Sequence, residues 1–148
     1  MMKPRTILVV ASILSIFGIA LFTFLQRNQQ PAQIFQATIH RDCAPWDGSA
    51  FRVSIPMRDG TSVDISIWKS PDIKIPVTFS FPDSTGQVGN ASYHLASDEY
   101  GQLNGKIFFW NVEEGSPVKG TFKLATEDGQ QFEGDFEAEW QNQVVFCG

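Results

Sequence analysis

Apolar and polar side chains alternate with a period of two residues over most of the chain from Ile34 onward. Successive side chains of a β-strand point to opposite faces of a sheet, so this period predicts strands with one buried face. The same part of the sequence holds no segment of helical length with an apolar period of 3.6 residues. The pattern therefore predicts an all-β domain.

The first predicted hairpin spans residues 51–67, where two alternating segments flank a short turn. The turn consists of Arg58, Asp59 and Gly60, and the glycine supplies the left-handed conformation that a three-residue hairpin loop requires. Residues that oppose each other across an antiparallel pair share a face, so odd positions must oppose odd positions. The predicted pairs are Phe51 with Ile67, Val53 with Ile65, and Ile55 with Val63.

A second hairpin is predicted at residues 118–138, with Glu127, Asp128 and Gly129 as its turn. The same parity rule aligns aromatic residues with glycines on one face and opposite charges on the other. The predicted pairs are Phe122 with Gly134, Phe136 with Gly120, Lys123 with Glu133, and Lys119 with Glu137. Each aromatic ring is expected to cover the bare backbone of the glycine opposite it.

The remaining strands are predicted from shorter patterns, and they complete the expected fold. Strands are expected at residues 75–81, 88–95 and 106–112, a last short strand at residues 143–147, and a loop at residues 98–104. Short strands joined by short turns are typical of small antiparallel domains. The sequence thus predicts a small antiparallel β-sandwich or barrel of seven to eight strands.

Residues 7–25 form an uncharged apolar run that bears on the location of the protein. As a helix, this run would cross the hydrocarbon core of a bilayer, which is about 30 Å thick. Lys3 and Arg5 precede the run, and positive flanks remain in the cytoplasm. We therefore expect a cytoplasmic segment at residues 1–6, a transmembrane signal anchor at residues 7–25, a polar linker at residues 26–33, and an extracytoplasmic domain, periplasmic or extracellular, at residues 34–148.

The alternative is a cleaved signal peptide, with Gly18 and Ala20 as the small residues of the cleavage site. The apolar run is longer than most signal-peptide cores, and the residues after that site are bulky and apolar, which favours the uncleaved anchor. Either interpretation places the domain outside the cytoplasm.

The charge of the chain limits its partners. The sequence has 11 Lys and Arg residues against 16 Asp and Glu residues, and all but two of the basic residues follow Gln26. An acidic domain repels phosphate backbones, so we do not expect nucleic acid as a partner.

Cys43 and Cys147 lie near the two ends of the predicted domain. Two thiols outside the cytoplasm normally pair, so a disulfide is expected between them. The alternative is a metal site that uses His40, Asp42 and Cys43, but the spacing fits no zinc module. The sequence also has no phosphate-binding or calcium-binding loop, so neither a metal nor a cofactor is predicted.

Trp46 is the first candidate contact residue, because it lies in a loop beside Asp42 and Asp47. An exposed tryptophan can anchor a partner, and the two carboxylates can steer a cationic or polyhydroxylated one. The alternative is that Trp46 plugs one end of the domain over the disulfide while Asp47 and Gly48 form a turn.

Phe108, Phe109 and Trp110 put aromatic side chains on both faces of one strand, so either one face is open or the strand is covered on both sides. Trp68 is out of phase with the apolar positions of its strand and is a surface candidate, whereas parity places Trp140 in the core. The predicted binding residues are Trp46, Trp68, Phe108, Trp110, Asp42 and Asp47.

No catalytic residue is predicted, because the sequence contains no nucleophile motif and no base paired with one. His94 is expected to be an ordinary strand or surface histidine. A hydrolase that uses dispersed carboxylates has no recognisable pattern, and its candidate residues are Asp98, Glu99, Glu113 and Glu114.

Three hypotheses for the function follow. The first is a membrane-anchored, extracytoplasmic binding or accessory module whose partner is another protein at the membrane surface. The second is a carrier of a small apolar ligand or lipid, held in an interior lined by Phe79, Phe81, Phe122 and Phe136. The third is the small hydrolase. The sequence does not define an oligomeric state.

Overall fold

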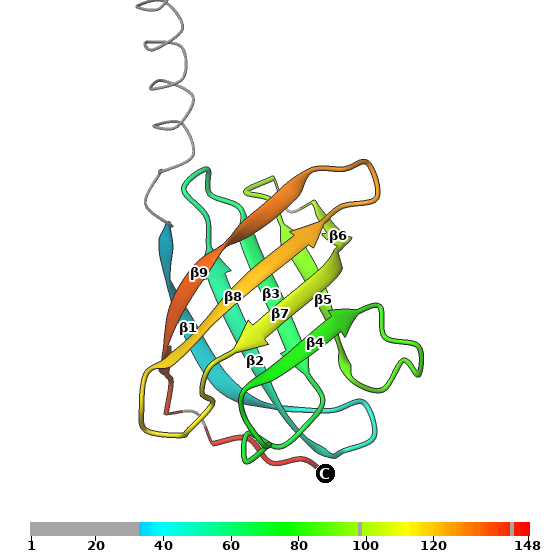
Figure 1. The fold of residues 1–148 in the computed structure, drawn as a ribbon. Coiled ribbons are helices and arrows are strands. Elements are labelled where there is room, and N and C mark those ends of the chain that lie inside the picture. Colours follow the sequence, from blue (N-terminus) through cyan, green and yellow to red (C-terminus); the bar gives the residue numbers. More distant parts are fainter. Residues whose placement is uncertain (1–32, 98, 143) are drawn as a thin grey trace, which may run out of the picture. The chain divides into compact units, whose positions relative to one another are not determined.

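The computed structural model describes residues 33–97, 99–142 and 144–148, and these residues form nine β-strands and no helix (Figure 1). The strands are β1 (Ile34–Cys43), β2 (Ser49–Pro56), β3 (Ser62–Ile67), β4 (Val77–Phe81), β5 (Gly89–His94), β6 (Tyr100–Gln102), β7 (Asn104–Phe109), β8 (Val118–Ala125) and β9 (Gln131–Trp140). The prediction of an all-β domain is confirmed.

The described residues contain no helix that is long and apolar enough to cross a membrane. The predicted signal anchor at residues 7–25, the segment before it and the linker through residue 32 lie outside the described residues.

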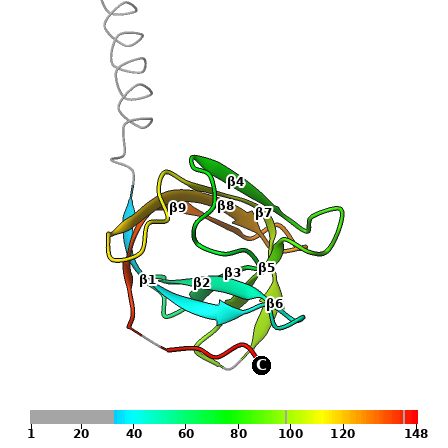
Figure 2. The ribbon, with the colours of Figure 1, turned by 90° about the horizontal axis from the view of Figure 1, so that it is seen from below.

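The nine strands form one curled sheet in the order β4-β7-β8-β9-β1-β2-β3-β5-β6. Figure 2 shows that β4, β7, β8 and β9 lie opposite β1, β2, β3 and β5. The two groups of strands are joined by β1 and β9, which pair in parallel, whereas every other neighbouring pair is antiparallel. The prediction of a wholly antiparallel fold was wrong at this pair, because no turn joins these two strands and no local pattern fixes their direction.

The first predicted hairpin is confirmed in register. Phe51 opposes Ile67, Val53 opposes Ile65, and Ile55 opposes Val63. The Met57 amide donates a hydrogen bond to the Thr61 carbonyl oxygen at 2.7 Å, which closes the loop, and Gly60 has a φ of 86°. The left-handed glycine is therefore where the sequence requires it.

The second hairpin also has the predicted register, from Gly120 opposite Phe136 to Phe122 opposite Gly134. Its outer face carries the predicted ion pairs, Lys119 with Glu137 at 3.5 Å and Lys123 with Glu133 at 3.6 Å. The Phe136 ring covers Gly120 as expected.

The prediction that the Phe122 ring covers Gly134 was wrong. The Phe35 side chain of β1 lies over Gly134, and Phe122 packs edge-on against Phe35 with their ring centroids 5.6 Å apart. The parallel pairing of β1 with β9 brings Phe35 to this position, and the hairpin pattern alone does not reveal it.

The core lies between the two facing parts of the sheet and is mostly aliphatic and aromatic. Phe109 is fully buried at its centre and makes edge-to-face contacts with Phe51, Phe79 and Phe136. These rings come from four different strands. Phe109 therefore links both layers of the sheet.

Two expectations about short segments were wrong. Residues 98–104 were expected to be a loop, but β6 and the start of β7 lie there, and β6 pairs with β5. The resulting nine strands exceed the predicted seven to eight. A last strand was expected at residues 143–147, yet residues 144–148 form no strand. In both cases the outcome depends on whether a neighbouring backbone is free to pair, which the side-chain pattern does not report.

The predicted disulfide between Cys43 and Cys147 is confirmed, with the two Cα atoms 5.5 Å apart. It attaches the C-terminal segment to the end of β1. A disulfide is compatible with an oxidising compartment.

Candidate functional site

Trp46 lies in a tight loop between β1 and β2. The Ala44 amide donates to the Gly48 carbonyl oxygen at 2.8 Å, and the Asp47 amide donates to the Ala44 carbonyl oxygen at 3.0 Å. Asp47 has a φ of 61°, so the loop reverses in a left-handed conformation. The Trp46 indole extends over Gly48, where a β-carbon would lie 2.7 Å from Nε1. The turn at Asp47 and Gly48 is thus present, but Trp46 remains 52% exposed and does not plug the domain.

Trp68 follows β3 and is half-buried. Its ring meets that of Trp46 edge to face, with the centroids 5.6 Å apart and an interplanar angle of 81°. The Trp68 amide donates to the Val88 carbonyl oxygen at 2.8 Å, which holds the backbone at this position. Two of the predicted contact residues, far apart in sequence, therefore form one pair.

Phe108 and Trp110 form a second edge-to-face pair, with centroids 4.5 Å apart. Phe108 is half-buried, Trp110 is 60% exposed, and the intervening Phe109 is fully buried on the opposite face. The Trp110 amide donates to the Lys119 carbonyl oxygen at 2.9 Å. One face of this strand is therefore open rather than covered.

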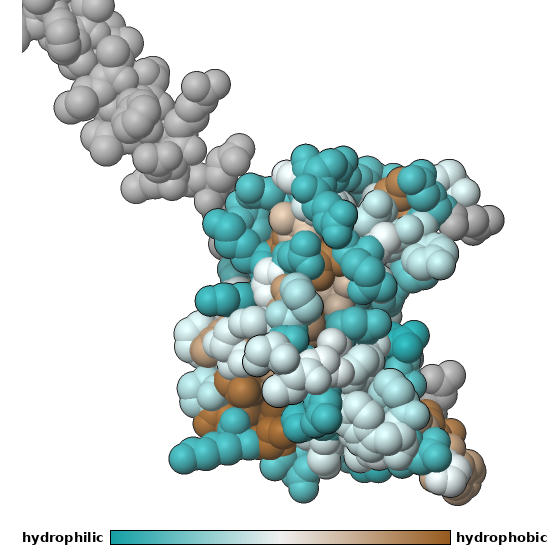
Figure 3. Space-filling model, turned by 90° about the vertical axis from the view of Figure 1, so that its right-hand side faces the viewer, coloured by the Kyte–Doolittle hydropathy of each residue, from teal (hydrophilic) through white to brown (hydrophobic). Residues whose placement is uncertain are grey.

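We call Trp46, Trp68, Phe108 and Trp110 the aromatic surface. Other large apolar side chains that were not predicted to be surface residues are also exposed, namely Ile34, Ile75, Val144 and Phe146. Figure 3 shows that the largest groups of apolar side chains on the face it draws lie in its lower half. The sequence did not indicate that Val144 and Phe146 are exposed, because the apolar pattern around them resembles that of a buried strand.

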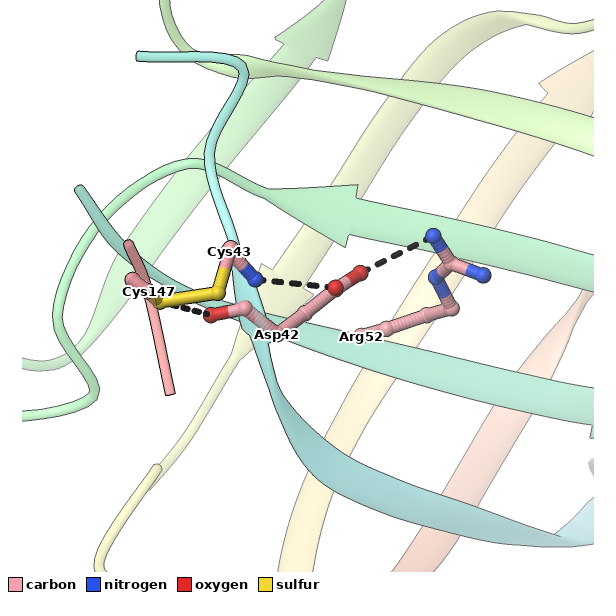
Figure 4. The surroundings of a disulfide bond; sticks show 4 residues. All are labelled: Asp42, Cys43, Arg52 and Cys147. Carbon is pink, nitrogen blue, oxygen red and sulfur yellow. Dashed lines mark hydrogen bonds and ion pairs between the residues drawn. A yellow bond between two sulfur atoms is a disulfide. The ribbon is translucent and has the colours of Figure 1, made fainter. Parts of the chain in front are cut away.

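Asp42 has a different role from the predicted steering charge (Figure 4). Its Oδ2 lies 2.9 Å from an Arg52 guanidinium nitrogen, and its Oδ1 accepts a hydrogen bond from the Cys43 amide at 2.8 Å. The Cys147 sulfur lies 3.8 Å from the Asp42 carbonyl oxygen. Asp42 therefore stabilises the surroundings of the disulfide and has its charge balanced, whereas Asp47 is exposed.

A surface groove of about 430 Å³ is formed by residues of β1 and β2 and of the segments that follow β3 and β7. It is lined by Arg41, Ser49, Ser70, Pro71, Asp72, Val112, Glu113 and Glu114. Arg41 binds Glu114 through two hydrogen bonds of 2.6 Å each, and these bonds, together with the charge of Glu114, raise the pKa of the Arg41 guanidinium. Sequence patterns did not predict this groove, because residues from β1, from β2 and from two later segments of the chain form it together.

A second groove, of about 700 Å³, lies beside the first and shares Arg41 and Glu114 with it. Trp140 lines the second groove, is half-buried against the core, and donates its Nε1 hydrogen to the Glu113 carbonyl oxygen at 3.0 Å. The prediction that Trp140 packs with the core holds in part, since the indole also reaches the surface.

His94 lies at the end of β5 and is exposed. Its Nε2 is 3.7 Å from Asp64 Oδ2, and its ring stacks on that of Tyr100. The Ser54 hydroxyl donates to the other carboxylate oxygen of Asp64 at 2.5 Å. The Ser54 hydroxyl and the His94 ring thus both lie against the Asp64 carboxylate. A nucleophilic triad instead requires a hydrogen bond between the serine and the histidine.

The four phenylalanines assigned to a carrier interior, Phe79, Phe81, Phe122 and Phe136, are buried in the core. The Phe122 and Phe136 rings contact each other, and Phe79 contacts Phe109. Side chains therefore occupy the space beside these rings. Within the part of the chain that the structure describes, no group of three His, Cys, Asp or Glu residues is arranged to hold a metal ion.

Comparisons with protein-family models, curated proteins and solved structures found no match to this chain.

Proposed function

We propose that the protein is a membrane-anchored, extracytoplasmic binding or accessory module that contacts another protein at the membrane surface through the aromatic surface. The apolar run at residues 7–25 would supply the anchor, and the disulfide suits a domain in an oxidising compartment. The curled sheet would serve as an open barrel that holds the contact residues in place.

The exposure of the two aromatic pairs is the observation that carries this proposal. Trp46 and Trp110 leave more than half of their surface in water although each packs against a second ring. Rigid aromatic side chains of this kind dominate the binding energy of many protein interfaces. The hydrogen bonds in the Trp46 loop and at Trp110 hold the backbone in place, so the protein loses little conformational entropy when a partner binds.

The position of Trp46 within the domain agrees with an outward contact. The first strand starts at Ile34 and ends at Cys43, three residues before Trp46. Ten strand residues span about 33 Å. A partner at Trp46 would therefore meet the domain far from the point where the chain enters its first strand.

The proposal is tested by replacing Trp46 and Trp68 together by Ala in the full-length protein. We expect the variant to lose at least one protein that the unaltered protein captures from detergent-solubilised membranes, because truncating a central aromatic residue commonly weakens binding about 30-fold. Tyr100→Ala is the matched control, since Tyr100 is 70% exposed and belongs to β6, outside the aromatic surface.

Capture is quantified by mass spectrometry, and circular dichroism verifies that each variant is folded. An identical set of captured proteins for the unaltered chain and the double variant would show that the aromatic surface is not the contact site.

A further inference from the structure

We propose that the 700 Å³ groove is a binding site for a neutral saccharide, which packs against Trp140 and is hydrogen-bonded by the polar side chains around that ring. The groove is separate from the proposed partner contact, because none of the described residues that line it belongs to the aromatic surface. Its volume falls within the range of about 300–1,000 Å³ that is usual for small-ligand sites.

Trp140 supplies an apolar wall of the groove in a fixed orientation. Its Nε1 donates to the Glu113 carbonyl oxygen at 3.0 Å, and its ring packs against the core. The next residue, Gln141, donates its amide hydrogen to the Ile39 carbonyl oxygen at 2.7 Å, which continues the pairing of β9 with β1. Val144 is 81% exposed and lines the same groove. The groove thus contains a rigid indole and a second apolar side chain.

The loop between β7 and β8 forms another wall of the groove and is also held in place. The Asn111 side-chain amide donates to the Pro117 carbonyl oxygen at 2.8 Å, and its oxygen accepts from the Lys119 amide at 2.9 Å. The Ser116 amide donates at 3.3 Å to the Glu113 carbonyl oxygen, which the indole also binds. Because the loop and the indole are joined in this way, the groove is formed before a ligand arrives, and binding costs little conformational entropy.

The polar groups of the groove offer hydrogen-bond donors and acceptors together. Arg41 and Glu114 bind each other through two hydrogen bonds of 2.6 Å each, which leaves further guanidinium N–H groups and carboxylate lone pairs available. The side-chain amides of Gln141 and Asn142 are exposed, and each carries a donor and an acceptor. A sugar hydroxyl is likewise both a donor and an acceptor, so neighbouring hydroxyls of one sugar ring can bind each of these groups.

Charge and polarity favour a neutral saccharide over other ligands. The C–H groups on the faces of a sugar ring are apolar and slightly positive, which matches the negative face of an indole. A wholly apolar ligand would leave the polar walls without hydrogen-bond partners, at a cost in free energy. Glu114 balances the charge of Arg41, and Glu139 adds a negative charge to the lining, so an anionic ligand is repelled.

The test uses the full-length protein in micelles of a phosphocholine detergent, which has no sugar headgroup to compete for the groove. The probes are four neutral trisaccharides, namely maltotriose, cellotriose, mannotriose and N-acetylated chitotriose, added up to about 20 mM. Binding is followed by NMR through the indole N–H signals of the four tryptophans. We expect at least one probe to shift the signal of Trp140 with a dissociation constant of about 1 mM or below, and to leave the signals of Trp46, Trp68 and Trp110 unchanged.

Two double variants measure the contribution of the groove. Gln141→Ala with Asn142→Ala removes both exposed amides and is expected to weaken binding of that probe about tenfold. The matched control is Gln87→Ala with Asn104→Ala, which removes one amide of each type at exposed positions outside the groove. We expect the control to bind within about twofold of the unaltered protein. Circular dichroism verifies that both variants are folded.

Two charged sugars and added salt test whether the ligand is neutral. Chitotriose without acetyl groups is cationic and is expected to bind no more tightly than the neutral probe, whereas trigalacturonic acid is anionic and is expected to bind at least about tenfold more weakly. Raising the NaCl concentration from about 0.05 M to about 0.3 M should change the affinity for the neutral probe by less than about twofold.

The inference is overturned if none of the neutral probes shifts the Trp140 signal, or if the two double variants weaken binding equally. Tighter binding of the cationic chitotriose, lost when salt is added, would also overturn it, because the carboxylates alone would then attract the ligand. Shifts confined to Trp46, Trp68 or Trp110 would assign the sugar to the aromatic surface instead. Capture of a partner protein bears only on the proposed function, so either proposal can fail without the other.

Discussion

At the scale of single residues, Asp83 organises the loop between β4 and β5. Its carboxylate accepts hydrogen bonds from the hydroxyl and the amide of Thr85 and from the amide of Val88. The Thr85 hydroxyl, followed by the Val88 amide, lowers the pKa of Asp83 to about 2. The loop therefore depends on an ionised side chain.

Asp83→Asn is expected to destabilise the protein at neutral pH and to have a smaller effect in acid. The pKa of Asp83 in the folded chain lies below its ordinary value, so its stabilising contribution is present above about pH 4 and is lost as the pH falls toward 2. Urea unfolding at pH 7 and at pH 2.5 would measure this difference. An equal loss of stability at both pH values would show that the charge of Asp83 does not matter.

Single residues of the aromatic surface could be predicted because their signals are local. Trp68 is out of phase with the buried positions of its strand, and parity alone assigns it to the outer face, whereas for Phe108 the sequence left open whether its face of the strand is covered. The role of Asp42 could not be predicted, because its partner Arg52 comes within reach only through the register of β1 with β2. In the sequence, an aspartate that attracts a ligand cannot be distinguished from an aspartate that forms an ion pair with an arginine.

At the scale of the element, β8 fits closely between β7 and β9 because Gly120 has no side chain. A β-carbon there would lie 2.2 Å from the Phe108 carbonyl oxygen and 2.7 Å from the Phe136 ring. The first of these contacts is with backbone, which cannot turn away. The glycine thus sets the spacing of the strand that carries the second aromatic pair.

Gly120→Ala is expected to lower the free energy of unfolding by about 1–3 kcal/mol, as overpacked cores usually do. Gly148→Ala is the control, since nothing lies within 4 Å of a β-carbon at that position. Chemical denaturation of both variants gives the comparison. Equal midpoints for the two variants would contradict the close packing described at β8.

Hairpins were predictable as elements, whereas contacts between distant elements were not. The turns at Gly60 and Gly129 define both registers within about twenty residues of sequence. The position of Phe35 over Gly134 requires the parallel pairing of β1 with β9, and β6 requires a free edge on β5. Such contacts depend on the order of all nine strands.

At the scale of the whole molecule, the disulfide and the β1–β9 pair connect the beginning and the end of the domain. The bond between Cys43 and Cys147 closes a ring of about 100 residues. A cross-link over so long a ring strongly restricts the unfolded chain. It also holds a C-terminal segment whose Val144 and Phe146 are exposed and form little of the core.

Replacing both Cys43 and Cys147 by Ser is expected to lower the free energy of unfolding by about 2–5 kcal/mol. Urea unfolding of the full-length chain under oxidising conditions measures the loss, and the same titration with a reductant should bring the unaltered protein to the stability of the variant. A variant with an unchanged midpoint would indicate that the cross-link contributes nothing to stability.

The seam between β1 and β9 has a consequence for biosynthesis. A ribosome makes β1 first among the strands and β9 last, so nearly the entire domain must be synthesised before the two groups of strands can join. Until then β1 has an uncovered edge that a chaperone or another nascent chain can occupy. Newly made molecules that stop short of residue 131 would lack the closing strand, and quality-control proteases would encounter two unconnected half-sheets.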